Sequence, residues 1–230
     1  MSTEKKISFH EPVLDIGTWR KIYLQFLKKL SINSICEVGS GHPSFLEIVN
    51  ANKKLAIDFG DDFRIEFQER NIDFLNLDLD NDNLNVKEKD FDVVVCSDVF
   101  EHLLKPERTL NFCKNLLHEE GLFFSHVPNE FNFYRLFGVM FFGRKSVFFH
   151  KGDEQNNPHL RRFSNIGYLN FLSKEFVYNI YISDLNYSGF KSMLNRISIP
   201  IPYGFQFGPT YISTNSKRKY EELRSIKTTF

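Results

Sequence analysis

Short apolar runs alternate with helical stretches along the first half of the chain. Five runs have the length and the branched or aromatic residues of strands: residues 34–38, 55–58, 72–77, 91–97 and 122–127. The run 91–97 is almost continuously apolar, which is typical of a strand buried on both faces. Stretches with helical spacing of apolar residues are 14–30, a segment starting at Pro43, 61–70 and 105–118. This alternation predicts an α/β fold, a Rossmann-like doubly wound and mainly parallel sheet with helices on both faces, in which 34–38 and 91–97 are parallel neighbours.

The pattern breaks after Pro128. Residues 129–163 show no clear period and are rich in aromatic and basic side chains, so we expect an insertion that acts as a lid outside the sheet. Further on, the pattern favours a helix at 164–173, strands at 176–183 and 209–214, and a frayed polar end at 217–230. We therefore predict a single domain over 1–230, divided into an N-terminal helix (14–30), a cofactor-binding half (34–128), the lid insertion (129–163) and C-terminal strands and helix (164–215).

Composition narrows the partners and the compartment. Lys plus Arg and Asp plus Glu are balanced at 29 each among 230 residues, which gives no general attraction to nucleic acid. Three cysteines at no metal-type spacing are predicted to be buried thiols in a reducing compartment. The first residues lack the apolar core of a secretory signal, and 131–149 holds too many charges to span a membrane. We expect a cytoplasmic protein without a transmembrane segment.

A glycine pair follows the first predicted strand. Gly39 and Gly41 stand where a parallel sheet binds ligands, and glycine there lets the backbone approach a ligand closely. Asp58 ends the second predicted strand, where a carboxylate can accept both hydroxyls of an adenosine ribose, and Asp78 follows the third. The pair alone would also suit a dinucleotide or an ordinary strand-to-helix turn.

The longer motifs resemble one family. Glu37-Val-Gly-Ser-Gly41 is similar to the E-x-G-x-G signature of class I S-adenosylmethionine-dependent methyltransferases, and the stretch 91–128 is similar to the second half of that domain. The likeness is strongest to the branch with ubiquinone-biosynthesis and glycan-modifying methyltransferases, and His159-Leu-Arg-Arg-Phe163 resembles the H-x-R-x-F run of that branch. The resemblance implies S-adenosylmethionine as cofactor. It assigns the methionine part to Glu37, Gly39, Ser40 and Gly41, the ribose to Asp58, the adenine amino group to Asp78, and the wall beside the sulfonium to Ser97 and Asp98.

Two positions depart from the family pattern. Pro43, with His42 beside it, replaces the third glycine of the loop, and Glu120-Gly121 replaces a Gly-Gly before the fifth strand. Proline suits a helix start because its missing N–H has no intrahelical partner there. The departures therefore do not argue against binding of the cofactor, but they leave the exact path of the loop undetermined.

Three histidines are candidates for a general base. His102 comes first because it follows the strand end nearest the expected methyl group, and His126 and His159 come next. Each can also be a hydrogen-bonded histidine without a catalytic role. Asp98 and Glu101 have the spacing of a helix capping box, although with His102 they would lie on one side of a first helical turn and could hold a divalent ion. Because the capping box explains two of the three, we expect no metal.

The acceptor is narrowed by what the chain lacks. Ser97-Asp-Val-Phe100 stands where amino-directed nucleic-acid methyltransferases carry an Asn/Asp-Pro-Pro-aromatic run, and no cysteine offers covalent carbon methylation. O-methylation remains. Between residues 131 and 163 there are six basic and two acidic side chains, among many aromatic ones. With Arg161 and Arg162 as binding residues, this insertion favours an anionic small-molecule or glycan-precursor acceptor, such as a sugar phosphate, a nucleotide-linked sugar or a surface-glycan intermediate. An ordinary solvated face and a weak contact with anionic lipid are the alternatives.

Two other functions fit part of the sequence. A nicotinamide-dependent oxidoreductase would also use Gly39, Gly41 and Asp58, but it leaves 91–128 unexplained. The altered glycine loop is also compatible with a non-catalytic partner protein that binds the cofactor. Oligomeric state and the identity of the acceptor have no signal in the sequence.

Overall fold

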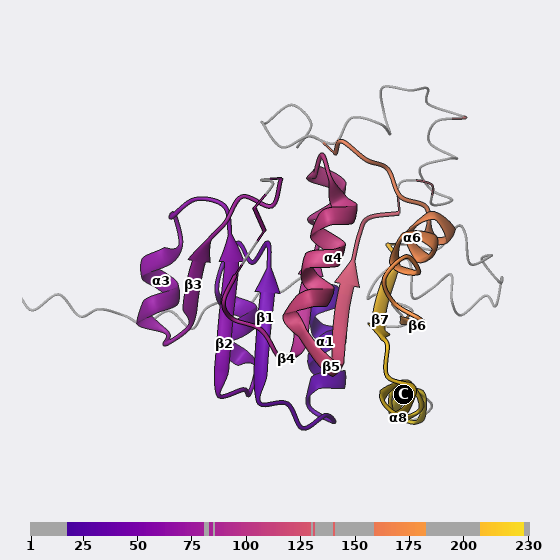
Figure 1. Cartoon of the computed structure of the whole chain (residues 1–230), viewed down its shortest axis with the longest axis horizontal. Helices are drawn as coiled ribbons and strands as arrows, with labels where there is room; N and C mark the ends of the chain where they lie inside the picture. The colour runs from indigo at the N-terminus through magenta and orange to yellow at the C-terminus, as the bar shows by residue number, and fades with distance from the viewer. Residues whose placement is uncertain are drawn as a thin grey trace, which may run out of the picture.

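The computed structural model describes residues 18–80, 83–84, 86–129, 131, 140, 159–182 and 208–227 (Figure 1). Within them, one seven-stranded sheet has the order β3-β2-β1-β4-β5-β7-β6. Its strands are β1 (Ser34–Val38), β2 (Lys53–Asp58), β3 (Asp73–Asn76), β4 (Phe91–Ser97), β5 (Leu117–His126), β6 (Tyr178–Ile182) and β7 (Thr210–Thr214). All neighbours pair in parallel except at β7, which is antiparallel to both β5 and β6. The predicted doubly wound sheet is confirmed, with β1 and β4 adjacent and parallel.

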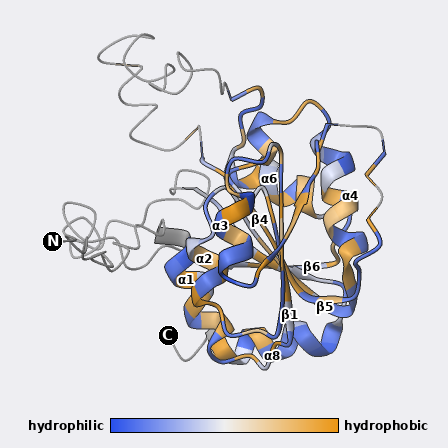
Figure 2. Ribbon diagram, turned by 90° about the vertical axis from the view of Figure 1, so that its left-hand side faces the viewer, coloured by the Kyte–Doolittle hydropathy of each residue, from blue (hydrophilic) through white to orange (hydrophobic). Residues whose placement is uncertain are grey.

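Helices cover both faces of this sheet (Figure 2). They are α1 (Thr18–Leu27), α2 (Ser44–Ile48), α3 (Arg64–Glu69), α4 (Pro106–Leu116), α6 (Asn165–Leu172) and α8 (Lys217–Lys227), with the 3₁₀ helix η1 (Phe100–His102). One apolar core joins α4 and α6 to the sheet, and the other joins α1, α2, α3 and α8 to the opposite face. No helix among the described residues has the length and apolar character that a bilayer crossing requires.

The central strand β4 explains the continuous apolar run of the sequence. Val94 and Cys96 point into the core under α4 and α6, whereas Val93 and Val95 point into the core under α1. All four side chains are fully buried, which explains why the middle of the strand is apolar on both faces. The three cysteines are buried free thiols, as predicted.

The C-terminal segment corrects the expectation of a frayed end. Residues 217–227 form α8, whose Tyr220, Leu223 and Ile226 recur at helical spacing and join the core on the α1 face. Leu223 is fully buried, and the ring of Tyr220 stacks on Tyr178 with centroids 4.8 Å apart. Every third residue being apolar is enough to dock the helix, although its other positions are polar.

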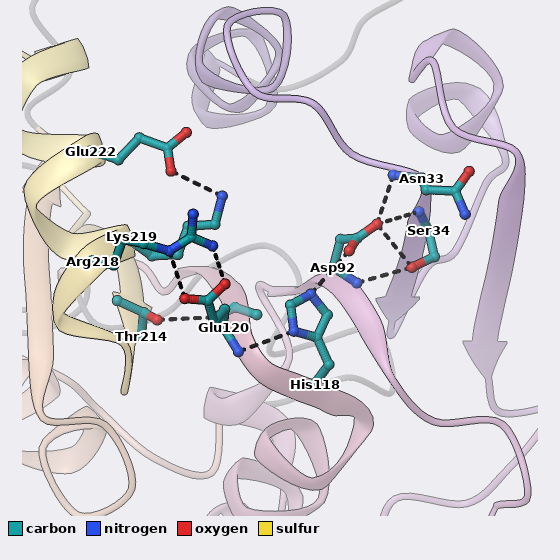
Figure 3. A network of polar contacts seen from close by, with 10 residues as sticks. Asn33, Ser34, Asp92, His118, Glu120, Thr214, Arg218, Lys219 and Glu222 are labelled. Atoms are coloured by element: carbon teal, nitrogen blue, oxygen red, sulfur yellow. Dashed lines mark hydrogen bonds and ion pairs between the residues drawn. The ribbon is translucent and has the colours of Figure 1, made fainter.

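Polar contacts tie α8 and β4 to the start of β5 at the amino end of the sheet (Figure 3). Asp92 accepts hydrogen bonds from the backbone N–H groups of Asn33 and Ser34 at 2.6 and 2.8 Å, and it pairs with His118 at 3.0 Å. The next link is Glu120, which donates its N–H to His118 and forms an ion pair with Arg218 of α8. These contacts stabilise the amino end of the sheet. The residues predicted to bind the cofactor lie at the opposite, carboxyl end.

Only part of the predicted lid belongs to the described residues. Of the range 129–163 these are Asn129, Phe131, Met140 and residues 159–163, and none lies in a strand of the sheet. Asn129 and Phe163 form an isolated parallel bridge, which brings the two ends of the insertion together. Four of its basic residues lie outside the described part, namely Arg135, Arg144, Lys145 and Lys151.

Candidate active site

The glycine turn lies at the point where the strand order reverses. β1 pairs with β2 on one side and with β4 on the other, and open α/β sheets bind their ligands at the carboxyl ends of two such strands. Gly39 and Gly41 have φ values of 70° and 55°, in the left-handed region that favours glycine. A Cβ at Gly39 would clash with the side chain of Val99, whereas a Cβ at Gly41 would meet open space. Gly39 thus allows close packing on the β4 loop, and Gly41 leaves its surroundings open to a ligand.

Glu37 stands below this turn with one oxygen unsatisfied. Its side chain is 2% exposed and receives a hydrogen bond from Arg20 of α1 at 3.1 Å through Oε1, while Oε2 has no partner. Burial raises the pKa of Glu37 to about 7 from an ordinary value of 4.5, against the opposing effect of Arg20. The hydroxyl of Ser40 is likewise buried without a partner. Two unpartnered polar groups at one turn are typical of a site that a polar ligand completes.

The loop after β1 follows a defined path despite its departures from the family pattern. Pro43 occupies the N-cap of the short helix α2, where its missing N–H needs no partner, as expected. His42 contacts both the loop and α3: its Nδ1 accepts the N–H of Ser44 at 3.3 Å, and its Nε2 lies 3.3 Å from Glu66 of α3. Pro43 therefore continues the turn into the helix that follows it.

The predicted ribose and adenine carboxylates stand at the ends of β2 and β3. Asp58 is partly buried and accepts the N–H groups of Gly41 and Phe59. Asp78 is exposed and accepts the N–H of Asp80 at 2.9 Å. Asp80 has a structural task, since its carboxylate accepts the N–H groups of Leu104 and Lys105 before α4. The roles of Asp58 and Asp78 toward a cofactor stay predictions.

The end of β4 differs from the predicted helix start. Asp98 has a φ of 56°, the η1 helix after it is a 3₁₀ turn, and no side chain caps it. The expected capping box between Asp98 and Glu101 is therefore wrong, because a left-handed residue turns the Asp98 side chain away from the helix axis. Asp98 Oδ1 instead lies 2.7 Å from Nδ1 of His126, at the end of β5. Ser97 faces the other way and shares a 3.2 Å hydrogen bond with the buried hydroxyl of Tyr23.

A second group of side chains gathers around η1. One ligand atom each of Glu101, His102 and His159 lie within 4.8 Å of one another, and the two imidazoles meet edge to face with centroids 4.8 Å apart. The Glu101 side chain is 2% exposed and its Oε2 has no hydrogen-bond partner. Burial, with the nearby Asp98 charge, raises the pKa of Glu101 to about 8. The structure thus splits the sequence set Asp98, Glu101 and His102 into two neighbouring groups.

The two arginines of the H-x-R run have different surroundings. Arg161, expected to bind the acceptor, donates its guanidinium to the carbonyls of Leu103 and Leu104 at 3.3 and 2.6 Å, and its backbone N–H to Glu101 at 3.0 Å. These bonds make it an anchor for the segment that carries His159, and its role toward the acceptor stays a prediction. Arg162 is exposed, and its role toward the acceptor stays a prediction.

Two residues of the site come from α1 and were missed by sequence reasoning. Arg20 contacts Glu37 across 17 positions and Tyr23 contacts Ser97 across 74. The amphipathic pattern of α1 predicts a helix but carries no signal for these partners, because polar contacts between distant segments follow only from how the helix docks.

Comparisons with known proteins agree with this arrangement. A family model described as "Methyltransferase domain" matches residues 10–179. Among curated proteins, a ubiquinone biosynthesis O-methyltransferase of Glaesserella parasuis serovar 5 (strain SH0165) is 42% identical over 40 residues, which cover 17% of this chain and 17% of that protein. The similarity to this relative therefore spans less than a fifth of its length.

Solved structures share the fold at low identity. A methyltransferase of Thermotoga maritima, described as a possible histamine N-methyltransferase, superposes with a TM-score of 0.55 and 16% identity over 86% of this chain and 91% of that one. The plantazolicin methyltransferase BpumL, solved with S-adenosylhomocysteine (SAH), gives 0.58 and 15% over 86% and 83%. Likeness at this level shows the fold alone.

Proposed function

The chain belongs to the methyltransferase-domain family, and from that premise we propose that it methylates an oxygen atom of a small polar or anionic acceptor. S-adenosylmethionine is the cofactor, and it supplies a methyl group made electrophilic by its sulfonium sulfur. The unpartnered Glu37 and Ser40 oxygens and the open space at Gly41 fit the methionine part of this cofactor. Asp58 and Asp78 would hold its ribose and adenine.

The observation that carries the oxygen chemistry is the pair formed by Asp98 and His126. Its 2.7 Å contact lies at the carboxyl ends of β4 and β5, beside the strand end that carries the glycine turn. If Nδ1–H donates to the carboxylate, Nε2 is the basic nitrogen of the neutral imidazole. A carboxylate that orients the ring and stabilises its protonated form is the usual partner of a histidine base. This support favours His126 over His102 as the base.

Proton transfer to His126 would complete the reaction. The acceptor oxygen forms the bond to the methyl carbon, the sulfur keeps the electron pair of the bond that breaks, and the hydroxyl proton passes to His126. General-base catalysis raises the rate about 10²- to 10⁴-fold, which corresponds to about 3–5 kcal/mol of the barrier. Holding donor and acceptor in line contributes roughly 7–11 kcal/mol. Positioning by the glycine turn and by the wall at Ser97 is thus the larger contribution.

An anionic acceptor is supported by charge rather than by contacts. Six basic side chains stand against two acidic ones between residues 131 and 163, and Arg162 is exposed beside the segment that reaches η1. Arginine grips phosphate or carboxylate through paired hydrogen bonds. The name of the curated relative, an O-methyltransferase, also supports oxygen as the atom methylated. Sugar phosphates, nucleotide-linked sugars and other glycan precursors are the first acceptors to try.

Calorimetry and a turnover assay test the proposal in sequence. The chain should bind SAH and not NAD in separate titrations. With S-adenosylmethionine carrying a labelled methyl group, a panel of phosphorylated sugars, nucleotide sugars, phenols and amines should then show label on oxygen only. Label on an amine nitrogen, or on none of the panel despite tight SAH binding, would reject O-methyl transfer.

Variants of the histidine pair test the base. His126→Ala should lower kcat by about 10²-fold or more with SAH affinity unchanged, and Asp98→Asn should lower it less. Raising the pH should recover part of the His126→Ala rate, since hydroxide can replace a lost base. His102→Ala provides the comparison, and a larger loss there than at His126 would return the base to His102.

A further inference from the structure

A compact group of nitrogen and oxygen ligands lies around η1, distinct from the Asp98–His126 pair. Glu101 and His102 are consecutive residues of η1, and His159 reaches them from beyond the insertion. Nε2 of His102 is 3.9 Å from Oε1 of Glu101, and the whole set of ligand atoms fits within 4.8 Å. Glu101 and His102 are close because they are consecutive, but His159 is 57 positions after His102, so the fold brings it to them.

The group is built into the fold rather than gathered on a surface. The segment that carries His159 is fixed by three bonds from Arg161: its N–H donates to the Glu101 carbonyl, and its guanidinium donates to the carbonyls of Leu103 and Leu104. Glu101 is 2% exposed at its side chain, and its Oε2 has no hydrogen-bond partner. A buried carboxylate oxygen without a partner is costly unless a cation or donor completes it.

We propose that Glu101, His102 and His159 bind one first-row divalent transition-metal ion, such as Zn²⁺ or Mn²⁺. Two imidazoles and one carboxylate suit these ions, whereas Mg²⁺ favours oxygen ligands alone. Ligand atoms about 2.0–2.2 Å from one ion stand roughly 3–3.5 Å apart, so a separation of 4.8 Å has to shorten by roughly 1.3–1.8 Å. Rotation of the two half-buried imidazoles can supply this change.

The ion has a place in the reaction as well as a site. Three protein ligands leave coordination positions for water or substrate, which is typical of catalytic rather than structural metal sites. The ion would bind the acceptor hydroxyl, lower its pKa and hold its oxygen near the carboxyl end of β4, while His126 takes the proton. This role rests on the proposed O-methyl transfer, but metal binding itself does not.

Titration with the metal alone tests the site. The chelator-treated chain should bind one equivalent of Zn²⁺ in calorimetry, and Co²⁺ bound in its place should show visible absorption. Glu101→Gln, His102→Gln and His159→Gln should each weaken binding at least about tenfold. His118→Gln, at the far end of the sheet, should keep the affinity and the Co²⁺ spectrum of the parent. Glu101→Gln preserves the shape of the side chain and removes only its ability to ionise, so its effect is readable even if a histidine variant folds poorly.

The outcomes separate the site from the reaction. Absence of binding, or parent affinity in all three variants, overturns the site whatever the chain methylates. Binding that is lost in the variants supports the site, even in a chain that methylates no oxygen acceptor, which would reject only the proposed function. If the chain both binds the metal and transfers a methyl group to oxygen, a chelator should lower turnover at least about tenfold, and Mn²⁺ or Zn²⁺ should restore it. Unchanged turnover would overturn the catalytic role of the ion.

Discussion

Replacing Glu37 by glutamine should stabilise the protein at high pH while weakening cofactor binding. The Glu37 carboxyl is buried, and its pKa of about 7 stands well above its ordinary value of 4.5. This difference corresponds to about 3 kcal/mol of free energy that penalises the ionised form in the folded protein. Glutamine has the shape of the protonated side chain but never ionises, so the variant escapes the penalty.

The direction in which stability changes with pH follows from proton binding. Between pH of about 4.5 and 7 the folded chain holds the Glu37 proton more tightly than the unfolded chain, so the free energy of unfolding falls as pH rises through this window. The difference between Glu37→Gln and the parent should therefore be near zero at about pH 4.5 and approach about 3 kcal/mol above pH 7. Urea unfolding at several pH values measures it, and common contributions such as that of Glu101 cancel in the difference.

Glu69→Gln is the matched control. Glu69 is exposed on α3, so the same substitution there alters no buried group and provides the comparison at each pH. A flat difference between Glu37→Gln and the parent across the same range would refute the argument, since it would mean that ionised Glu37 carries no penalty.

The same variant tests the cofactor site. The methionine part of the cofactor carries an ammonium group, which in the proposed binding mode would donate to the unpartnered Oε2 of Glu37. A hydrogen bond to a charged group is worth roughly 1.5–3 kcal/mol, so SAH affinity at about pH 8 should fall about tenfold or more. A variant that is both more stable and binds SAH as tightly as the parent would remove Glu37 from the site.

Three other substitutions probe the turn, the ribose site and the amino end of the sheet. Asp58→Asn should weaken SAH binding at least about tenfold in calorimetry, because a charged acceptor of two hydroxyls becomes a neutral amide, and unchanged affinity would contradict its role. Gly39→Ala should lower both the melting temperature and SAH affinity, since its φ of 70° and Val99 leave no room for a Cβ; a variant that melts with the parent would contradict this packing. Burial raises the pKa of Asp92, but hydrogen bonds from Asn33, Ser34 and His118 outweigh burial and lower it. Asp92→Asn should therefore cost about 1–3 kcal/mol in urea unfolding at neutral pH, a loss that shrinks as pH falls below about 4, and a constant loss would point to shape rather than charge.

The sheet was readable from the sequence because burial on both faces makes the middle of its central strands apolar. β4 shows this most clearly, with Val93 to Cys96 fully buried. α8 was missed for the opposite reason: only Tyr220, Leu223 and Ile226 face the core, and eight polar or charged neighbours hide that stripe. Packing against the sheet stabilises such a helix, and the polar composition of the segment does not indicate this packing.

The conformation of the glycine turn was predictable for a chemical reason. The left-handed backbone and the close packing on Val99 require glycine at position 39, and this holds although Pro43 replaces the third glycine of the loop. The roles of Arg20 and Tyr23 could not be predicted, because each depends on where α1 lands on the sheet rather than on local spacing.

One backbone angle accounts for the largest difference between the predicted and observed site. Helical spacing from Asp98 predicts that its carboxylate, Glu101 and His102 share one side, but this holds only if Asp98 is itself near helical geometry. Its φ of 56° turns the carboxylate to His126, and Glu101 and His102 are left to meet His159 instead. A non-glycine residue held in the left-handed region stores strain, and such strain persists where function selects it. Here it divides the run 98–102 between the pair of Asp98 with His126 and the proposed metal site, so that neither has to share a ligand with the other.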